Sequence, residues 1–190
     1  MEYSFKETAC SSSALFATLT DNEEKELYRL HRLYYREARK CENAKAYLAG
    51  CVMLGSALET MLVLMINVYP EEAGQTGKIP RYRNRPKALR HWKLEELLRV
   101  VKAAGWLPFA LDVEKEDWNS RKARIGDYAE VVRMIRNLVH PARYMVDRPG
   151  GRATLNRLRC QFQVVDLCRD WLVGHVHQSL RVEMEAEGLL

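Results

Sequence analysis

The sequence predicts an all-α fold, an up-and-down bundle of four to five helices with one long basic loop. Three observations predict this class. Apolar residues recur at the three- and four-residue spacing of α-helices, no segment shows the alternation of a β-strand, and glycines and prolines gather between the periodic segments. A chain of 190 residues is about one domain in length. We therefore expect an irregular segment over residues 1–20 and a single helical domain over residues 21–190.

The first periodic segment begins with a capping box. Thr20 supplies a hydroxyl at the cap and Glu23 follows three residues later, an arrangement that starts a helix. This helix or its continuation is expected to reach Tyr69, because Pro70 disfavours helical geometry in the residue before it. An unbroken helix of that length would be far above the usual mean, so we expect a break near residues 39–43.

The most apolar segment, from Cys51 to Val68, is nearly long enough to span a membrane. Glu59 lies at its middle, and a central carboxylate favours a helix buried in a protein core over a bilayer span. The five cysteines are odd in number and include no C-x-x-C pair, and the N-terminus lacks the pattern of a signal peptide. These features predict a protein of the reducing cytoplasm, with no membrane contact and no metal ion.

The rest of the chain predicts a loop and three further helices. Prolines and glycines punctuate residues 70–90, which we expect to form the loop. From the apolar spacing and the stop signals, the expected helices cover residues 91–104, 125–139 and 154–185. A short helix near residues 113–118 and a turn at residues 149–151 are also expected.

Positive charge is concentrated in the predicted loop and the start of the helix after it. The net charge is +5, whereas residues 81–93 alone carry +6, so the rest of the chain has a net charge of −1. Cations beside an aromatic ring suit single-stranded RNA, because bases stack on planar groups while the cations bind phosphates. The candidate RNA-binding residues are Arg81, Tyr82, Arg83, Arg85, Lys87 and Arg90. The alternative is a solvated loop whose Trp92 anchors the next helix.

The helix expected over residues 125–139 carries a polar stripe at its end. At about 100° per residue, Arg133, Asn137 and His140 fall within about 60° of one another. They lie on a side turned away from the apolar, core-facing residues, and Arg136 lies on the border between the two sides. The core-facing residues are Tyr128, Val132, Ile135 and Val139.

Two interpretations of the stripe are open. In one, Arg133 and Asn137 form a solvated face and His140 satisfies the last carbonyls of its helix. In the other, the three side chains act on an RNA phosphodiester: imidazole exchanges protons near neutral pH, arginine stabilises phosphoryl charge, and asparagine orients the imidazole or the sugar. The RNA 2′-hydroxyl is then the nucleophile, so no metal or other cofactor is needed. One helix cannot surround a phosphodiester, but two copies across a two-fold axis could.

These residues resemble a known motif. Six residues separate Arg133 from His140, which is similar to the R-x(4–6)-H signature at a helix end in the HEPN superfamily of small helical bundles. Asn137 and Pro141 also match several branches of that superfamily. The apolar segment around Glu59 resembles the long second helix of the fold, which often carries an acidic residue facing the site.

The resemblance, which covers residues 22–185 as an architecture, implies a bundle that forms a homodimer. Many members are metal-independent endoribonucleases of toxin–antitoxin, phage-defence (abortive-infection) or CRISPR-linked systems, so RNA and an antitoxin or other protein are the implied partners. The implied catalytic residues are Arg133, His140 and Asn137, with Glu59 and Arg136 supporting the site.

The motif also departs from its common form, R-N-x-x-x-H, in which asparagine directly follows the arginine. Here the adjacent pair is Arg136–Asn137, with three instead of four residues between the arginine and His140. Either Arg133 is the partner of His140 or the motif is shortened. Glu59 is either a paired buried acid or a supporting residue of the site. Many HEPN proteins are inactive scaffolds, so the alternative function is a non-catalytic helical module that binds protein or nucleic acid.

Overall fold

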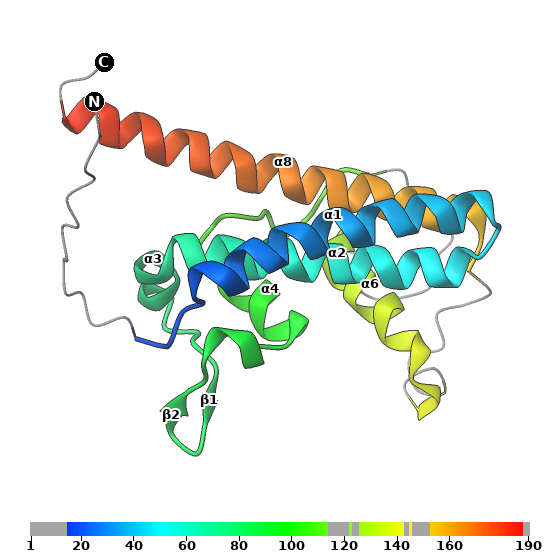
Figure 1. The fold of residues 1–190 in the computed structure, drawn as a ribbon, viewed down its shortest axis with the longest axis horizontal. Coiled ribbons are helices and arrows are strands. Elements are labelled where there is room, and N and C mark those ends of the chain that lie inside the picture. Colours follow the sequence, from blue (N-terminus) through cyan, green and yellow to red (C-terminus); the bar gives the residue numbers. More distant parts are fainter. Residues whose placement is uncertain (1–14, 114–121, 123–125, 143–144, 146–152, 188–190) are drawn as a thin grey trace.

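The computed structural model describes residues 15–113, 122, 126–142, 145 and 153–187, which form the predicted all-α bundle (Figure 1). The helices are α1 (Asp21–Asn43), α2 (Tyr47–Val68), α3 (Pro70–Gln75), α4 (Leu94–Ala103), α6 (Tyr128–Arg136) and α8 (Leu155–Ala186). Two 3₁₀ turns are η1 (Leu89–His91) and η2 (Asn137–Val139). Helices α1 and α2 form an antiparallel pair, and α4, α6 and α8 pack against α2.

Helix α1 begins as predicted. The Thr20 hydroxyl accepts a hydrogen bond from the Glu23 amide, and the Glu23 carboxylate accepts one from the Thr20 amide at 2.9 Å. The predicted break before α2 is present, but it falls at residues 44–46 instead of 39–43. Lys45 adopts a φ of 57° in this break. Glycine is the usual residue for that conformation. Because a lysine stands there instead, the sequence does not show where the break falls.

Helix α2 is the central helix of the bundle. By length and composition it could cross a membrane, yet 72% of its most apolar window is buried inside the protein. Its buried residues include Leu54, Leu58, Leu62 and Ile66. A helix buried on most sides is typical of the core of a soluble bundle, so the prediction of a core helix is confirmed.

The loop predicted over residues 70–90 is only partly a loop, and the expectation of no β-structure is wrong here. Pro70 occupies the first turn of α3, where its missing amide hydrogen removes no helical hydrogen bond. An antiparallel hairpin follows, formed by β1 (Arg81–Tyr82) and β2 (Arg85–Pro86). Arg83 and Asn84 both have positive φ, as a two-residue primed turn requires. Glycine or asparagine usually occupies the position of Arg83 in such a turn. Because an arginine stands there, the hairpin could not be predicted from the sequence.

Helices α4 and α8 form close to their predicted bounds, whereas α6 is shorter than predicted. Helix α6 begins after Asp127, whose carboxylate caps it, and gives way to η2 at Asn137. The expected turn at residues 149–151 and nearly all of the expected helix at residues 113–118 lie outside the described residues. The predicted motif therefore spans the end of α6 and the turn η2 that follows it.

Candidate functional site

Helix α6 carries the predicted motif and packs its apolar side against α2. Three of the residues predicted to face the core, Tyr128, Val132 and Ile135, are buried. Val139 is 49% exposed, so its assignment to the core-facing side is wrong. The cause is the change to a 3₁₀ turn, which advances about 120° per residue instead of about 100°. His140 therefore lies beyond the α-helix, at an angle to Arg133 that differs from the ideal stripe.

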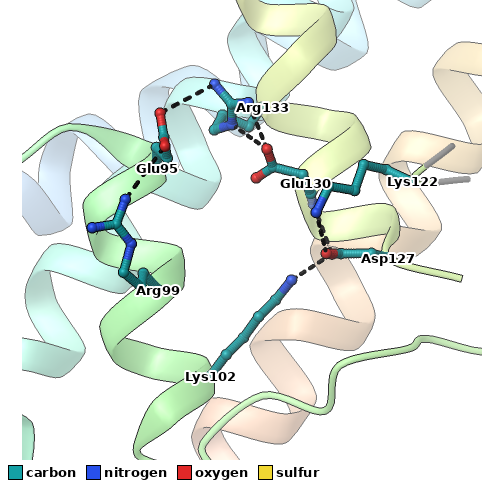
Figure 2. A network of polar contacts seen from close by, with 7 residues as sticks. All are labelled: Glu95, Arg99, Lys102, Lys122, Asp127, Glu130 and Arg133. Carbon is teal, nitrogen blue, oxygen red and sulfur yellow. Dashed lines mark hydrogen bonds and ion pairs between the residues drawn. The ribbon is translucent and has the colours of Figure 1, made fainter. Parts of the chain in front are cut away.

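Arg133 does not belong to a solvated face, because two acids hold it against the protein (Figure 2). Its Nε and Nη2 donate to Oε1 of Glu130 at 2.8 and 2.5 Å, and its Nη1 lies 3.9 Å from Oε2 of Glu95 on α4. The side chain is only 19% exposed. The solvated interpretation of the stripe is therefore wrong at Arg133, whose guanidinium is oriented by Glu130.

A second part of this network fixes the start of α6 (Figure 2). The buried carboxylate of Asp127 accepts a hydrogen bond from the Glu130 amide at 3.2 Å and pairs with the ammonium of Lys102 on α4. Lys122 lies 3.8 Å from the other oxygen of the same carboxylate. The pair of Asp127 and Lys102 therefore joins the start of α6 to α4.

Arg136 turns toward α2. Its Nη2 lies 2.5 Å from Oε2 of Glu59, so the two predicted supporting residues are brought together. Gly55 stands one turn before Glu59 on α2, and a Cβ added there would lie 2.6 Å from Cβ of Arg136. Such a contact is shorter than side chains tolerate, so glycine at this position gives the arginine the room to lie against the helix.

Glu59 and Arg136 line a cavity of about 600 Å³ between α1, α2, η1 and α6. Burial raises the pKa of the Glu59 carboxyl above its usual value, and the Arg136 guanidinium offsets this only in part. Of the two interpretations of Glu59, a paired acid is confirmed. Its position in the wall of a cavity also makes its carboxylate reachable by a ligand.

His140 lies at the exposed end of η2. Its backbone amide donates to the Asn137 carbonyl at 3.0 Å, but within the described part of the chain its imidazole makes no hydrogen bond to the last carbonyls of the helix. The interpretation in which this side chain caps the helix is therefore wrong. Among the described residues of one chain, neither Arg133 nor Arg136 contacts the imidazole, so the structure does not join the three predicted groups in a single site.

The predicted basic segment divides into two parts. Lys87 and Arg90 are engaged within the protein, since Lys87 Nζ lies 2.6 Å from Glu96 and Arg90 Nη1 lies 3.2 Å from Glu23. The exposed part is the hairpin, with Arg81, Tyr82, Arg83 and Arg85. Within the described ranges none of these three arginines has an acidic partner, and the hairpin borders an open concave surface of about 720 Å³. Free cations on such a surface can bind phosphates.

The alternative interpretation of this segment is confirmed in one respect, the anchoring role of Trp92. The indole is buried, its Nε1 donates to the Lys87 carbonyl at 3.0 Å, and its ring lies 4.9 Å from that of Phe16. The hairpin therefore has a fixed base, and its arginines project from a rigid support.

Sequence reasoning missed the groups that hold the motif arginines. Glu130 precedes Arg133 by three residues, a helical ion-pair spacing that could have revealed this contact. Glu95 and Gly55 reach the motif only through the packing of α4 and α2 on α6. No local pattern marks residues of that kind.

In the part of the chain that the structure describes, no group of three His, Cys, Asp or Glu side chains could hold a metal ion. Comparisons with protein-family models, curated proteins and solved structures found no match to this chain. What the protein does is therefore inferred from its own side chains, and membership of the HEPN superfamily stays a prediction.

Proposed function

We propose that this protein is a metal-independent endoribonuclease of HEPN type that acts in the cytoplasm as a homodimer. The observation that carries the proposal is the exposed imidazole of His140, which is not spent on capping its own helix. Imidazole is the side chain that most often acts as a general acid or base in proteins, and RNA cleavage requires both roles. The hairpin, whose three arginines have no acidic partner among the described residues, supplies a surface for the RNA strand.

The proposed reaction uses one imidazole from each copy. His140 of one copy accepts the proton of the RNA 2′-hydroxyl, the 2′-oxygen bonds to the adjacent phosphorus, and the bond to the 5′-oxygen breaks. His140 of the second copy donates a proton to that departing oxygen. Asn137 orients the imidazole or the sugar. The products are a 2′,3′-cyclic phosphate and a 5′-hydroxyl.

Arg133 is proposed to stabilise the phosphoryl charge. Glu130 fixes one edge of its guanidinium, and a phosphate oxygen would replace Glu95, whose 3.9 Å separation is too long for a hydrogen bond. Glu95 is exposed, so it can move away when RNA binds. Arg136, held by Glu59, would keep the end of α6 in place.

An apolar surface beside His140 supports the homodimer. Leu48 and Val139 are exposed, and together with Leu138 they line an open groove of about 730 Å³. If the grooves of two copies cover each other, apolar surface is removed from water and the two η2 turns approach across the two-fold axis. An antitoxin or other partner protein of a defence system would act by blocking this end of the molecule.

The test is cleavage of single-stranded RNA by purified protein in EDTA. Wild type is expected to release fragments with cyclic phosphate ends, and His140→Ala is expected to lose about 10²- to 10⁴-fold in rate. His177→Ala is the matched control, because His177 is an exposed imidazole on α8, and it should cleave like wild type. Equal cleavage by wild type and His140→Ala, or none by either, would refute the enzymatic proposal.

A second candidate is a module that binds RNA without cleaving it. It is favoured by one observation: both motif arginines are paired with acids, whereas the hairpin arginines have no acidic partner in the described ranges. This candidate predicts RNA binding that weakens steeply with salt and that depends on Arg81, Arg83 and Arg85. RNA binding by wild type without any cleavage would decide for it.

A further inference from the structure

The cavity of about 600 Å³ lies between the two regions proposed to contact RNA. One wall contains Arg136, the last residue of α6 before η2. Another part of the wall contains Leu89, Arg90 and Trp92, which follow the hairpin within a few residues. A strand that ran from the hairpin to His140 would therefore pass the mouth of this cavity.

The walls of the cavity suit a flat ring. The apolar lining residues are Leu19, Leu27, Leu30, Val63, Leu89 and Trp92, and the other lining residues are polar or charged, among them Glu23, Glu26 and Arg90. The volume falls within the range of small-molecule pockets in proteins, which is about 300–1,000 Å³. Sites that hold a planar ligand combine apolar walls with polar groups that fix the orientation of the ligand.

Of the charged residues in the walls, Glu59 and Arg136 are the least exposed, and they are joined through one oxygen and one nitrogen at 2.5 Å. Among the described residues the other carboxylate oxygen has no hydrogen-bond donor. A half-buried carboxylate has lost part of its hydration, and a single cationic partner replaces only some of the hydrogen bonds that water would make. A ligand with hydrogen-bond donors next to an acceptor could satisfy both groups. Its donors would bind the Glu59 carboxylate, and its acceptor would bind the Arg136 guanidinium.

Among the RNA bases, guanine presents this pattern most fully. Its Watson–Crick edge carries two parallel N–H donors, at N1 and N2, next to the acceptor O6. A carboxylate can accept both donors at once, and arginine is the usual partner of O6. Adenine, cytosine and uracil do not carry two donor nitrogens side by side, so none of them can donate to both oxygens of a carboxylate at once. We propose that this cavity binds an unstacked guanine of the RNA, an inference that rests on the proposed function for its RNA ligand.

The arrangement is set before any ligand binds. Gly55 lets the stem of Arg136 lie against α2, and this places the guanidinium beside Glu59. A side chain at residue 55 would push the arginine away from the wall. The cavity thus holds its donor and acceptor in fixed positions, which lowers the entropy lost when a base is bound.

The test is calorimetric titration of the full chain with GMP, IMP, AMP and CMP, which carry the same phosphate. GMP is expected to bind most tightly, and IMP, which lacks the N2 amine, about tenfold more weakly. Glu59→Gln is expected to weaken GMP binding about tenfold or more and to remove the preference over IMP. Glu71→Gln is the matched control, since this exposed acid of α3 does not line the cavity, and it should bind GMP like wild type.

A second variant covers the case in which Glu59→Gln fails to fold. Ser56→Leu fills the cavity and leaves the ion pair in place, because Ser56 Oγ bonds only the Val52 carbonyl; circular dichroism should be unchanged and GMP binding lost. No GMP binding by wild type, equal affinity for all four, or wild-type affinity in Ser56→Leu would overturn the inference. GMP binding needs no His140, so guanine recognition without cleavage refutes only the enzymatic proposal, and cleavage without GMP binding refutes only this one.

Discussion

The hairpin and the end of α6 both carry arginines, but they hold them in opposite ways. At the end of α6, Arg133 is bound by Glu130 and Arg136 by Glu59, and both guanidinium groups are largely covered. At the hairpin the arginines project into solvent with no acidic partner among the described residues. The sequence shows a row of cations in both places, and only the packing separates them.

The difference teaches which charges are available to a ligand. An arginine already paired with a carboxylate must give up that partner before it binds a phosphate, whereas an exposed arginine gives up only water. We therefore expect the hairpin to supply RNA affinity and the end of α6 to supply the reactive imidazole. Each prediction below tests one side of this division.

The largest expected effect concerns RNA affinity. Replacing Arg81, Arg83 and Arg85 by alanine should weaken single-stranded RNA binding by roughly tenfold to hundredfold and lower the slope of log K against log salt by about 2, since each phosphate contact on a single strand contributes about 0.7. His140→Ala should bind RNA like wild type. Fluorescence anisotropy over a series of salt concentrations measures both; an unchanged salt slope in the triple variant would show that the hairpin does not bind phosphates.

The next effect is on stability, at the clamp that fixes α6. Asp127→Ala removes a helix cap and leaves Lys102 without its partner in a largely covered position, so unfolding free energy should fall by about 3 kcal/mol. Glu185→Gln, at an exposed pair with Arg181 on α8, should change it by less than about 0.5 kcal/mol. Urea denaturation compares the two, and equal losses would mean that the buried network does not hold α6 to α4.

The sequence predicted what local patterns determine. The Thr20–Glu23 capping box forms because cap and partner are three residues apart in one segment. The break at Lys45 was expected but misplaced, because its φ of 57° is imposed by the turn and not by a glycine. The hairpin was missed for the same reason, since Arg83 takes a conformation that its side chain does not favour.

The candidate site was predicted as a set of residues but not as a geometry. Helical spacing placed Arg133, Asn137 and His140 together by assuming one angle per residue, and the 3₁₀ turn η2 breaks that assumption. The partners of the arginines come from α2 and α4, far away in sequence. Contacts of that kind depend on how the helices pack, which a periodic pattern does not encode.

A smaller effect is expected at Gly55, and a matched glycine gives the opposite sign. Gly55→Ala brings a Cβ to 2.6 Å from Arg136, so unfolding free energy should fall by about 1–2 kcal/mol despite the better helix propensity of alanine. Gly174→Ala, inside α8 with nothing near its Cβ, should raise it by up to about 1 kcal/mol. Thermal denaturation of both variants checks this; stabilisation by both would mean that Arg136 moves aside freely.

The smallest effect is a pH dependence whose sign differs between the two regions. Burial raises the pKa of Glu59 above 4.5 despite Arg136, so its contribution to stability is full below pH 4.5 and is lost as the pH rises through its folded-state pKa. Burial also acts on Glu96 beneath the hairpin, but hydrogen bonds from Lys87 and the Lys93 amide outweigh it and lower the pKa. Its contribution is present above pH 4.5 and is lost as the pH falls through the folded-state pKa. Between mildly acidic and neutral pH, wild type should therefore lose stability relative to Glu59→Gln, whereas below pH 4.5 it should lose stability relative to Glu96→Gln. Urea denaturation across this pH range measures both differences in unfolding free energy. If the two differences changed with pH in the same direction, the opposite pKa shifts of Glu59 and Glu96 would be contradicted.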